Sequence, residues 1–311
     1  MPVFRCGICG SQSWQALSEM DGKTGCPLLT ALCLQCAVAQ VTPLPDAETL
    51  HAFYAQAYRE AYKGVRRPKK KHVARAARLA SERLGWLAPR LFPGARLLDI
   101  GAGGGEFVAL ARARGFDAEG VEPHAGYAAH ARAAYAAPVA SVPLDALELR
   151  PDFHLVTAFH VLEHLRDPVI ALRRLSGCLS PEGALAIEVP NLSYQHAAPR
   201  NTFFAAHLFH FTPETLISTA ARAGLRPLEA QIAGDGAVIR AIFRPGAGVA
   251  EAPPASLAAE IMALYARRTW GRYLLSPRVW RKLPARLWRV AEESFWSLRC
   301  RRAEDIIRRL A

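Results

Sequence analysis

The chain has 311 residues, of which 51% are hydrophobic and 21% are charged, and its formal net charge is +12. This composition excludes an intrinsically disordered protein, and the length suffices for one nucleotide-binding domain with smaller flanking modules. No apolar run is long enough for a transmembrane helix, and the first residues lack the apolar core of a secretory signal. We therefore expect a cytoplasmic protein, with a peripheral position at the inner membrane as the alternative.

Hydrophobic periodicity and composition divide the chain into four regions. Residues 1–45 carry cysteines and lack helical periodicity, and residues 46–93 form a helical connector. The connector contains four aromatic residues, Phe53, Tyr54, Tyr58 and Tyr62, followed by the basic run 66–71. Residues 94–245 alternate between strand and helix patterns, and residues 255–311 form a basic helical region.

Four of the seven cysteines form two Cys-x-x-Cys pairs, Cys6 with Cys9 and Cys33 with Cys36. In a cytoplasmic chain such pairs indicate a metal site and not disulfides. Four thiolates suit a tetrahedral structural zinc ion, and a module this small lacks a core that would fold without one. We therefore predict a small N-terminal zinc-binding module, in which Cys26 is an alternative ligand.

The third region predicts an α/β domain. Strands are expected at 95–100, 118–121, 138–142, 153–159 and 184–189, followed by two late strands at 225–233 and 237–243. Helices are expected at 106–114, 127–134, 167–179 and 213–223. Strands that alternate with helices indicate a mostly parallel sheet covered on both faces.

A glycine-rich turn follows the first of these strands. Gly101, Gly103 and Gly105 lie between a buried strand and a helix, where bare backbone lets a ligand lie close to the helix N-terminus. Glu122 ends the second strand, where a carboxylate can accept hydrogen bonds from both hydroxyls of a ribose. A dinucleotide fingerprint would need glycine where this chain has Glu106. In addition, a negative charge at the start of a helix disfavours binding of a pyrophosphate there.

The segment Leu97-Leu98-Asp99-Ile100-Gly101-Ala102-Gly103-Gly104-Gly105 resembles motif I of class I S-adenosylmethionine-dependent methyltransferases. Glu122 resembles their ribose-binding acid, and His160-Val161-Leu162-Glu163-His164-Leu165 resembles the segment after strand four in a bacterial subgroup. The resemblance implies a Rossmann-like domain with S-adenosylmethionine as cofactor. It places Asp99 and the three glycines in the cofactor site, Asp145 near the adenine, and His160 beside the methionine part.

The N-terminal module resembles the zinc domain of deoxysugar C-methyltransferases, which precedes the same core. That family has a Tyr-His-Glu-His segment after the fifth strand of the core. Here the chain reads Ala205-Ala206-His207-Leu208-Phe209-His210, so His207 can match the second histidine but Ala206 replaces the glutamate. This departure argues against carbon methylation and leaves a related sugar-modifying role open.

Four side chains are candidates for the base that deprotonates a hydroxyl acceptor: Glu163, His164, His207 and His210. Histidine suits proton transfer near neutral pH, and all four are expected beyond the carboxyl ends of strands, where open α/β sheets bind ligands. Each also has a structural alternative. In particular, Thr212 and Pro213 after His210 can simply begin a helix.

The C-terminal region mixes tryptophan with arginine. Residues 265–311 contain thirteen Lys or Arg but only four Asp or Glu. Three interpretations remain open: a helical subdomain that packs its tryptophans on the core, a weak contact with an anionic membrane surface, or a contact with nucleic acid or protein. Pro277 and Pro284 argue against one continuous amphipathic helix.

These patterns predict methyl transfer to a small-molecule or saccharide acceptor, with a hydroxyl of a surface glycan, its precursor or a nucleotide sugar as the expected target. RNA is the first alternative acceptor, because a zinc ribbon with excess positive charge can follow phosphates. The strand end Phe159-His160-Val161 lacks the Asn/Asp-Pro-Pro-aromatic turn of enzymes that methylate amino groups of nucleobases. Two more functions stay open at this point, a sugar C-methyltransferase and a catalytically silent binding module.

Overall fold

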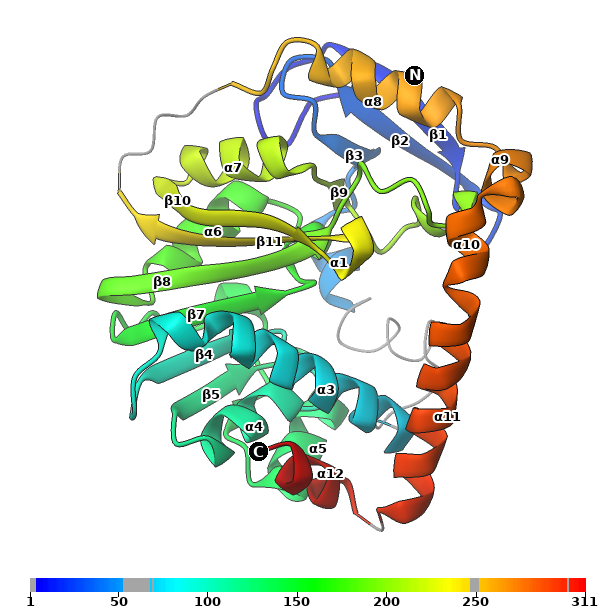
Figure 1. Ribbon diagram of the computed structural model, residues 1–311. Helices are drawn as coiled ribbons and strands as arrows, with labels where there is room; N and C mark the ends of the chain where they lie inside the picture. The colour runs from blue at the N-terminus through cyan, green and yellow to red at the C-terminus, as the bar shows by residue number, and fades with distance from the viewer. Residues whose placement is uncertain (1–3, 53–67, 69, 247–251, 301) are drawn as a thin grey trace. The chain divides into compact units, whose positions relative to one another are not determined.

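The computed structural model describes residues 4–52, 68, 70–246, 252–300 and 302–311 (Figure 1). The four connector aromatics and residues 66, 67 and 69 of the basic run lie outside the described residues. The connector contributes two described helices, α1 (Ala47–Ala52) and α3 (Lys70–Leu87). Residues 14–42, predicted only as non-helical, form three short strands, β1 (Trp14–Met20), β2 (Pro27–Cys33) and β3 (Ala39–Thr42).

One sheet contains seven strands in the order β10-β11-β8-β7-β4-β5-β6. Their bounds are β4 (Arg96–Ile100), β5 (Asp117–Val121), β6 (Val139–Ala140), β7 (Phe153–Phe159), β8 (Leu179–Pro190), β10 (Leu225–Ala233) and β11 (Val238–Pro245). The pairs β4–β5 and β5–β6 are parallel, whereas β11 is antiparallel to both β8 and β10. The predicted α/β class is confirmed, and the two late strands form an antiparallel edge.

The helix predicted at 167–179 is shorter than expected. Helix α6 (Pro168–Ser176) begins where the Asp167 side chain accepts a hydrogen bond from the Ile170 N–H, and Gly177 ends it. Leu179 already belongs to β8, which starts five residues before the predicted strand at 184. Proline and glycine are uncommon inside a strand, but Gly183 lies where a Cβ atom would come within 2.6 Å of the Phe153 carbonyl oxygen.

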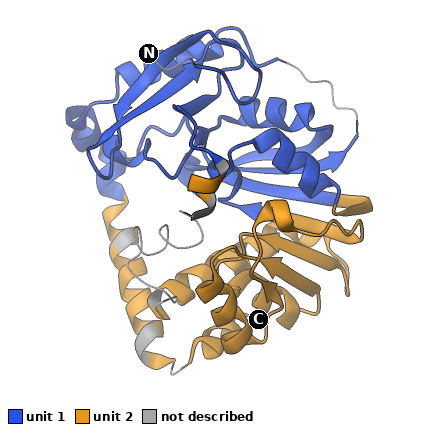
Figure 2. Ribbon diagram, turned by 180° about the vertical axis from the view of Figure 1, so that it is seen from behind, with its two compact units in different colours: residues 1–47, 158–177, 184–281 blue, residues 48–157, 178–183, 282–311 orange. Residues whose placement is uncertain are grey.

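The chain forms two compact units (Figure 2). Unit 1 contains residues 1–47, 158–177 and 184–281, and unit 2 contains residues 48–157, 178–183 and 282–311. Both units therefore combine segments that are distant in sequence, and the C-terminal region predicted as one piece is divided between them.

In unit 1, the strands of the N-terminal module form a second sheet with β9 (Phe209–His210), in the order β1-β2-β3-β9. Strand β9 pairs antiparallel with β3, so that Ala39 lies opposite His210 and Gln40 opposite Phe209. Helix α8 (Leu257–Ala266) packs Leu257, Ala258 and Ile261 against Leu32, Ala39 and Phe203 in one buried cluster. The module thus shares its sheet and its core with later parts of the chain.

Helix α7 (Pro213–Arg222) follows β9 and confirms the expected helix start at Thr212. The Thr212 hydroxyl accepts a hydrogen bond from the Thr215 N–H, and the Thr215 hydroxyl accepts one from the Thr212 N–H. This reciprocal cap fixes the chain direction directly after His210. Unit 1 also contains α9 (Trp270–Leu275) and α10 (Pro277–Arg281), which are separated by the break expected at Pro277.

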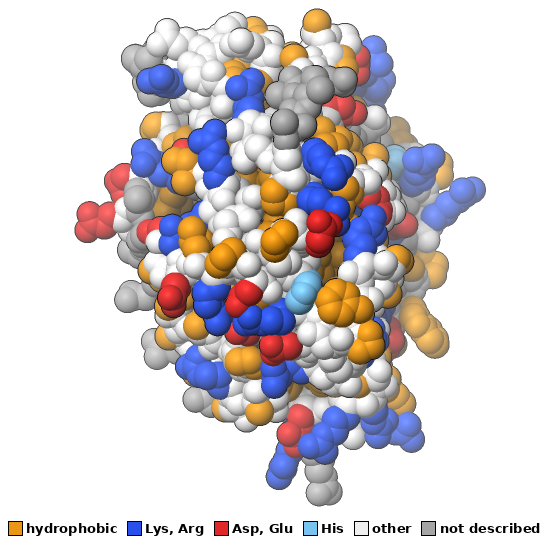
Figure 3. All heavy atoms as spheres, turned by 90° about the vertical axis from the view of Figure 1, so that its left-hand side faces the viewer, with side chains coloured by type: hydrophobic (Ala, Val, Ile, Leu, Met, Phe, Trp, Pro, Cys, Tyr) orange, Lys and Arg blue, Asp and Glu red, His pale blue; other side chains and the backbone are white. Residues whose placement is uncertain are grey.

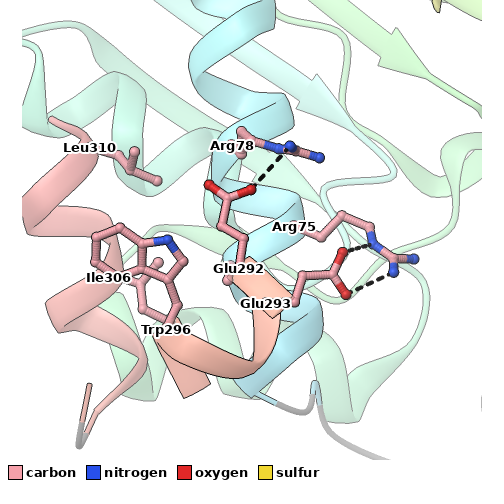
Figure 4. A pocket seen from close by; sticks show the side chains of 8 residues that line it. Arg75, Arg78, Glu292, Glu293, Trp296, Ile306 and Leu310 are labelled. Atoms are coloured by element: carbon pink, nitrogen blue, oxygen red, sulfur yellow. Dashed lines mark hydrogen bonds and ion pairs between the residues drawn. The ribbon is translucent and has the colours of Figure 1, made fainter. Parts of the chain in front are cut away.

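In unit 2, helix α4 (Glu106–Ala113) follows β4 and helix α5 (Ala125–Tyr135) follows β5. The C-terminal helices α11 (Leu283–Arg299) and α12 (Ala303–Leu310) pack beside α3. A pocket between these helices is lined by Trp296, Ile306 and Leu310 (Figure 4). Glu293 accepts two hydrogen bonds from the Arg75 guanidinium, at 2.6 and 2.8 Å, and so ties α11 to α3.

Within the described residues, none of the helices combines the length and the apolar character needed to span a bilayer.

Candidate functional site

The glycine turn in unit 2 has the backbone conformation that its sequence predicts. Gly101, Gly103 and Gly105 all have positive φ angles, of 70°, 56° and 84°. At Gly105 a Cβ atom would come within 2.5 Å of the Ala131 side chain on α5. Glycine is therefore required here by close packing of the turn on a helix as well as by backbone conformation.

Glu122 is buried directly after β5, and backbone N–H groups hold its carboxylate. Oε2 accepts a hydrogen bond from the Gly103 N–H at 2.8 Å, and Oε1 accepts one from the His124 N–H at 3.1 Å. The predicted turn and the predicted acid thus belong to one hydrogen-bonded structure.

Asp99 and Asp145, which are also predicted for the cofactor site, differ in how far they are buried. Asp99 is buried at the end of β4, where its carboxylate accepts a hydrogen bond from the Thr157 hydroxyl at 2.7 Å. Burial raises the pKa of Asp99 to about 7 in spite of this hydrogen bond. Asp145 lies in the short helix Leu144–Ala146 and has an exposed side chain.

His160 is the first residue of unit 1 after β7 and has a left-handed backbone, with φ of 56°. Its Nδ1 lies 3.2 Å from Glu163 Oε1 and its Nε2 lies 3.2 Å from Glu188 Oε1. Desolvation lowers the pKa of His160, but the hydrogen bonds and negative charges of the two glutamates outweigh it and raise the pKa to about 9. At neutral pH His160 is therefore an imidazolium.

Glu163, His164 and His207 lie together in unit 1. His164 Nδ1 lies 2.6 Å from the Ala206 carbonyl oxygen, and its Nε2 lies 4.0 Å from Glu163 Oε1. The His164 and His207 rings pack edge to face, with centroids 4.9 Å apart. Burial, followed by the neighbouring histidines, holds the pKa of His207 well below its usual range. His207 is therefore a neutral imidazole at pH 7.

His210 lies on β9 beside this group, with its ring centroid 6.0 Å from that of His207. Its side chain is buried, and burial lowers its pKa to about 4. Its Nε2 has no hydrogen-bond partner among the described residues. The structure thus brings all four predicted base candidates together in unit 1, two from the segment after β7 and two from the segment that ends in β9.

The N-terminal module holds the loop that carries His207. Asp21 is buried and accepts hydrogen bonds from the N–H groups of Lys23, Thr24 and Ala205. Burial disfavours this charge, but the N–H groups outweigh it and lower the pKa of Asp21. The Gly22 N–H also donates to the Phe203 carbonyl oxygen, at 2.8 Å.

The four cysteines of the paired motifs converge in unit 1. The sulfur atoms of Cys6, Cys9, Cys33 and Cys36 all lie within 4.8 Å of one another and could hold a metal ion. Cys6 and Cys36 sulfurs are 3.6 Å apart, and Cys9 and Cys33 sulfurs are 3.5 Å apart. Sulfurs around a tetrahedral zinc ion are about 3.8 Å apart, so the spacing fits. Cys26 is exposed and is not part of the cluster.

A methyltransferase domain family matches residues 71–230, just over half of the chain. The chain belongs to this family. It is therefore a methyltransferase, which confirms the predicted enzyme class.

Solved structures agree with this methyltransferase fold. A 1,6-didemethyltoxoflavin-N1-methyltransferase from Burkholderia thailandensis is 20% identical, with a TM-score of 0.51 over 70% of this chain and 96% of that chain. A magnesium protoporphyrin IX methyltransferase from Synechocystis is 11% identical, with a TM-score of 0.50 over 65% of this chain and 100% of that chain. At these identities the likeness concerns the fold alone. No curated protein matches the chain.

Sequence reasoning assigned no role to two residues that shape the methyltransferase site. Glu188 binds His160 and also accepts a hydrogen bond from the Arg240 guanidinium at 2.8 Å, so it organises a buried charged group. Asp21 fixes the histidine loop from the other end of the chain. The signal for Glu188 was its place in the segment Glu188-Val189-Pro190-Asn191, which follows where the family resemblance expects it. Asp21 gave no signal, because its partner is a backbone N–H distant in sequence.

Proposed function

We propose that this methyltransferase transfers a methyl group from S-adenosylmethionine to a hydroxyl of a saccharide or related small molecule, such as a surface glycan, its lipid-linked precursor or a nucleotide sugar. The observation that carries the proposal is the cluster of Glu163, His164, His207 and His210, which gathers several proton acceptors in one place. A hydroxyl must lose its proton during methylation, so it needs such a group.

The glycine turn and Glu122 fit S-adenosylmethionine. The backbone-held carboxylate of Glu122 suits the two ribose hydroxyls, and the turn presents bare backbone at Gly101 and Gly103. When bound, this cofactor supplies a methyl group on a positively charged sulfur. The imidazolium of His160 suits the carboxylate of the methionine part, and Asp145 suits the adenine amino group. Asp99 supports the turn from within the sheet, through its hydrogen bond from Thr157.

The proposed reaction is an in-line displacement. The acceptor oxygen forms a bond to the methyl carbon, the carbon–sulfur bond breaks with its electron pair on sulfur, and the hydroxyl proton passes to a histidine. His207 is our first choice for that base because it is neutral at pH 7 and only partly buried. Glu163, His164 and His210 surround it and orient it.

A saccharide acceptor is supported by the role of the N-terminal module. Its resemblance to the zinc domain of deoxysugar methyltransferases covers the part of the chain whose Asp21 holds the His207 loop. Carbon methylation of a sugar is a second candidate, because His207 can match the second histidine of the segment that family uses. RNA is less favoured: on the face shown in Figure 3, Lys and Arg side chains are interspersed with Asp and Glu.

We also propose that Cys6, Cys9, Cys33 and Cys36 bind one zinc ion as thiolates. Four protein ligands leave no open coordination position, so the ion is structural and takes no part in methyl transfer. Its binding free energy would stabilise the sheet that pairs with β9.

We further propose a weak contact of α11 with anionic membrane surfaces. This helix exposes several large apolar side chains: Leu283, Leu287, Trp288, Val290 and Phe295. Trp288 is 73% exposed, contrary to the interpretation in which the tryptophans pack on the core. Arg299 lies 5.1 Å from the centre of the Phe295 ring, which places a cation beside one of them. Such a surface suits the boundary between headgroups and acyl chains.

Replacing Glu122 with alanine should weaken S-adenosylmethionine binding at least 10-fold, because the ribose hydroxyls lose their acceptor. Gly105→Val should abolish binding, because the new side chain would displace α5 from the turn. Calorimetry with the purified protein measures both affinities. Glu119→Ala, on the same strand, is the control and should bind normally; unchanged affinity in Glu122→Ala and Gly105→Val would refute the cofactor site.

Incubation with radiolabelled S-adenosylmethionine and fractionated cell extract should place the label in saccharide or lipid-linked saccharide fractions. His207→Ala should reduce this transfer about 100-fold with little change in cofactor affinity, since general-base catalysis contributes at least that much. His196→Ala, a histidine outside the cluster in the same unit, should remain active. Label confined to RNA would overturn the proposal in favour of an RNA methyltransferase.

Elemental analysis of the purified protein should find zinc bound by the four cysteines. Cys33→Ser should lose this zinc and expose the N-terminal module to limited proteolysis, because the metal supplies its folding free energy. Cys26→Ser is the matched control and should keep both its zinc and its protease resistance. A zinc-free wild-type chain with the same resistance would contradict the assignment.

Vesicle flotation tests the contact of α11 with lipid. Wild-type protein should float with vesicles that contain phosphatidylglycerol but not with neutral phosphatidylcholine vesicles, and moderate salt should reduce the binding. Leu287→Ser combined with Trp288→Ser should remove it. Ile170→Ser changes an exposed apolar residue on α6 and should have no effect. Equal flotation of the double variant and the wild type would exclude α11 as the contact.

A further inference from the structure

Three side chains of the histidine cluster could hold a second metal ion. Glu163, His164 and His207 each offer one ligand atom, and these atoms lie within 4.8 Å of one another. We propose that these three residues bind a divalent transition metal ion that holds the oxygen of the acceptor. The inference deepens the proposed function and rests on it for the acceptor, but metal binding itself can be measured without acceptor or cofactor.

The backbone prepares His164 as a ligand. Its Nδ1 lies 2.6 Å from the Ala206 carbonyl oxygen, which can only accept a hydrogen bond, so Nδ1 carries the proton. In that tautomer the lone pair is on Nε2, the atom that lies 4.0 Å from Glu163 Oε1. Histidines that bind metals commonly donate their other N–H to a backbone carbonyl in this way.

Glu163 has an oxygen that no described residue satisfies. The side chain is only 1% exposed, and Oε1 is bound by His160. Oε2 is buried and has no hydrogen-bond partner among the described residues. A buried carboxylate oxygen without a partner is costly, and each such oxygen in a protein calls for an explanation. A metal ion bound by this carboxylate and the two imidazoles would compensate for the missing partner.

His207 is held in place but remains partly accessible. Its ring packs against the Phe204 ring, with centroids 4.1 Å apart, and edge to face against His164. The Lys23 ammonium lies 3.6 Å from the centre of the Phe204 ring on the same loop, and Asp21 fixes the neighbouring Ala205 N–H. The ligand set is therefore built from two segments, and the N-terminal module fixes the one that carries His207.

The donor set indicates the class of metal and of ligand. Two imidazoles with one carboxylate suit zinc and related transition metals, whereas magnesium and calcium prefer oxygen donors alone. Three protein ligands leave coordination positions open, unlike the closed set of four thiolates. Two neighbouring hydroxyls of a sugar would fit these positions. With the metal bound, His207 would be a ligand and not the base. The metal would lower the pKa of the bound hydroxyl, whose proton would pass to water, and the oxygen would then form the bond to the methyl carbon as the carbon–sulfur bond breaks.

Equilibrium dialysis of the full chain against micromolar zinc, followed by elemental analysis, tests the site. We expect about two zinc ions per wild-type chain and about one in Glu163→Gln and in His207→Gln, because the four cysteines keep theirs. His196→Ala should keep two. Circular dichroism spectra and melting temperatures close to those of the wild type show that the variants are folded.

One zinc ion in the wild-type chain, or two in both Glu163→Gln and His207→Gln, would overturn the inference. A wild-type chain that binds two zinc ions but methylates no hydroxyl compound would instead count against the proposed function, so the two failures are distinguishable.

Discussion

The buried negative charge of Glu163 organises the site in unit 1. A carboxylate that is almost fully removed from water must be compensated, and here His160 gives it a charged partner. His164 approaches it from the same segment and His207 from the loop before β9. Glu188 adds a second buried charge that is balanced by His160 and Arg240. The histidines therefore differ in charge: His160 is an imidazolium at neutral pH, whereas His207 and His210 are neutral imidazoles.

The N-terminal module and the histidine loop form one structural element. Their connection consists of the β3–β9 pairing, the hydrogen bonds of Asp21 and Gly22, and the cluster in which Phe203 packs with α8. Backbone pairing provides the fixed geometry that a catalytic or metal-binding histidine needs.

The α/β class, β7, the start of α7, the glycine turn with Glu122 and the cysteine pairs were predictable, because each depends on residues close in sequence or on a strict spacing. The start of β8 was missed, since its proline and glycine resemble a loop, and so was the division of the C-terminal region between two units. Long-range pairings such as Asp21 with Ala205 leave no local pattern. The tautomer of His164 likewise depends on a carbonyl that only the folded chain brings near.

The four-stranded sheet takes three strands from the beginning of the chain and its fourth, β9, from the segment between His207 and Thr212. A recombination event could replace only residues 1–45 with those of a related enzyme. The new β3 would then have evolved to pair with a different β9. Chimeras, whether natural or engineered, should therefore be viable only when residues 203–211 travel with the module. The two segments, which lie in opposite halves of the gene, would then have to be inherited together for acceptor preference to be passed on.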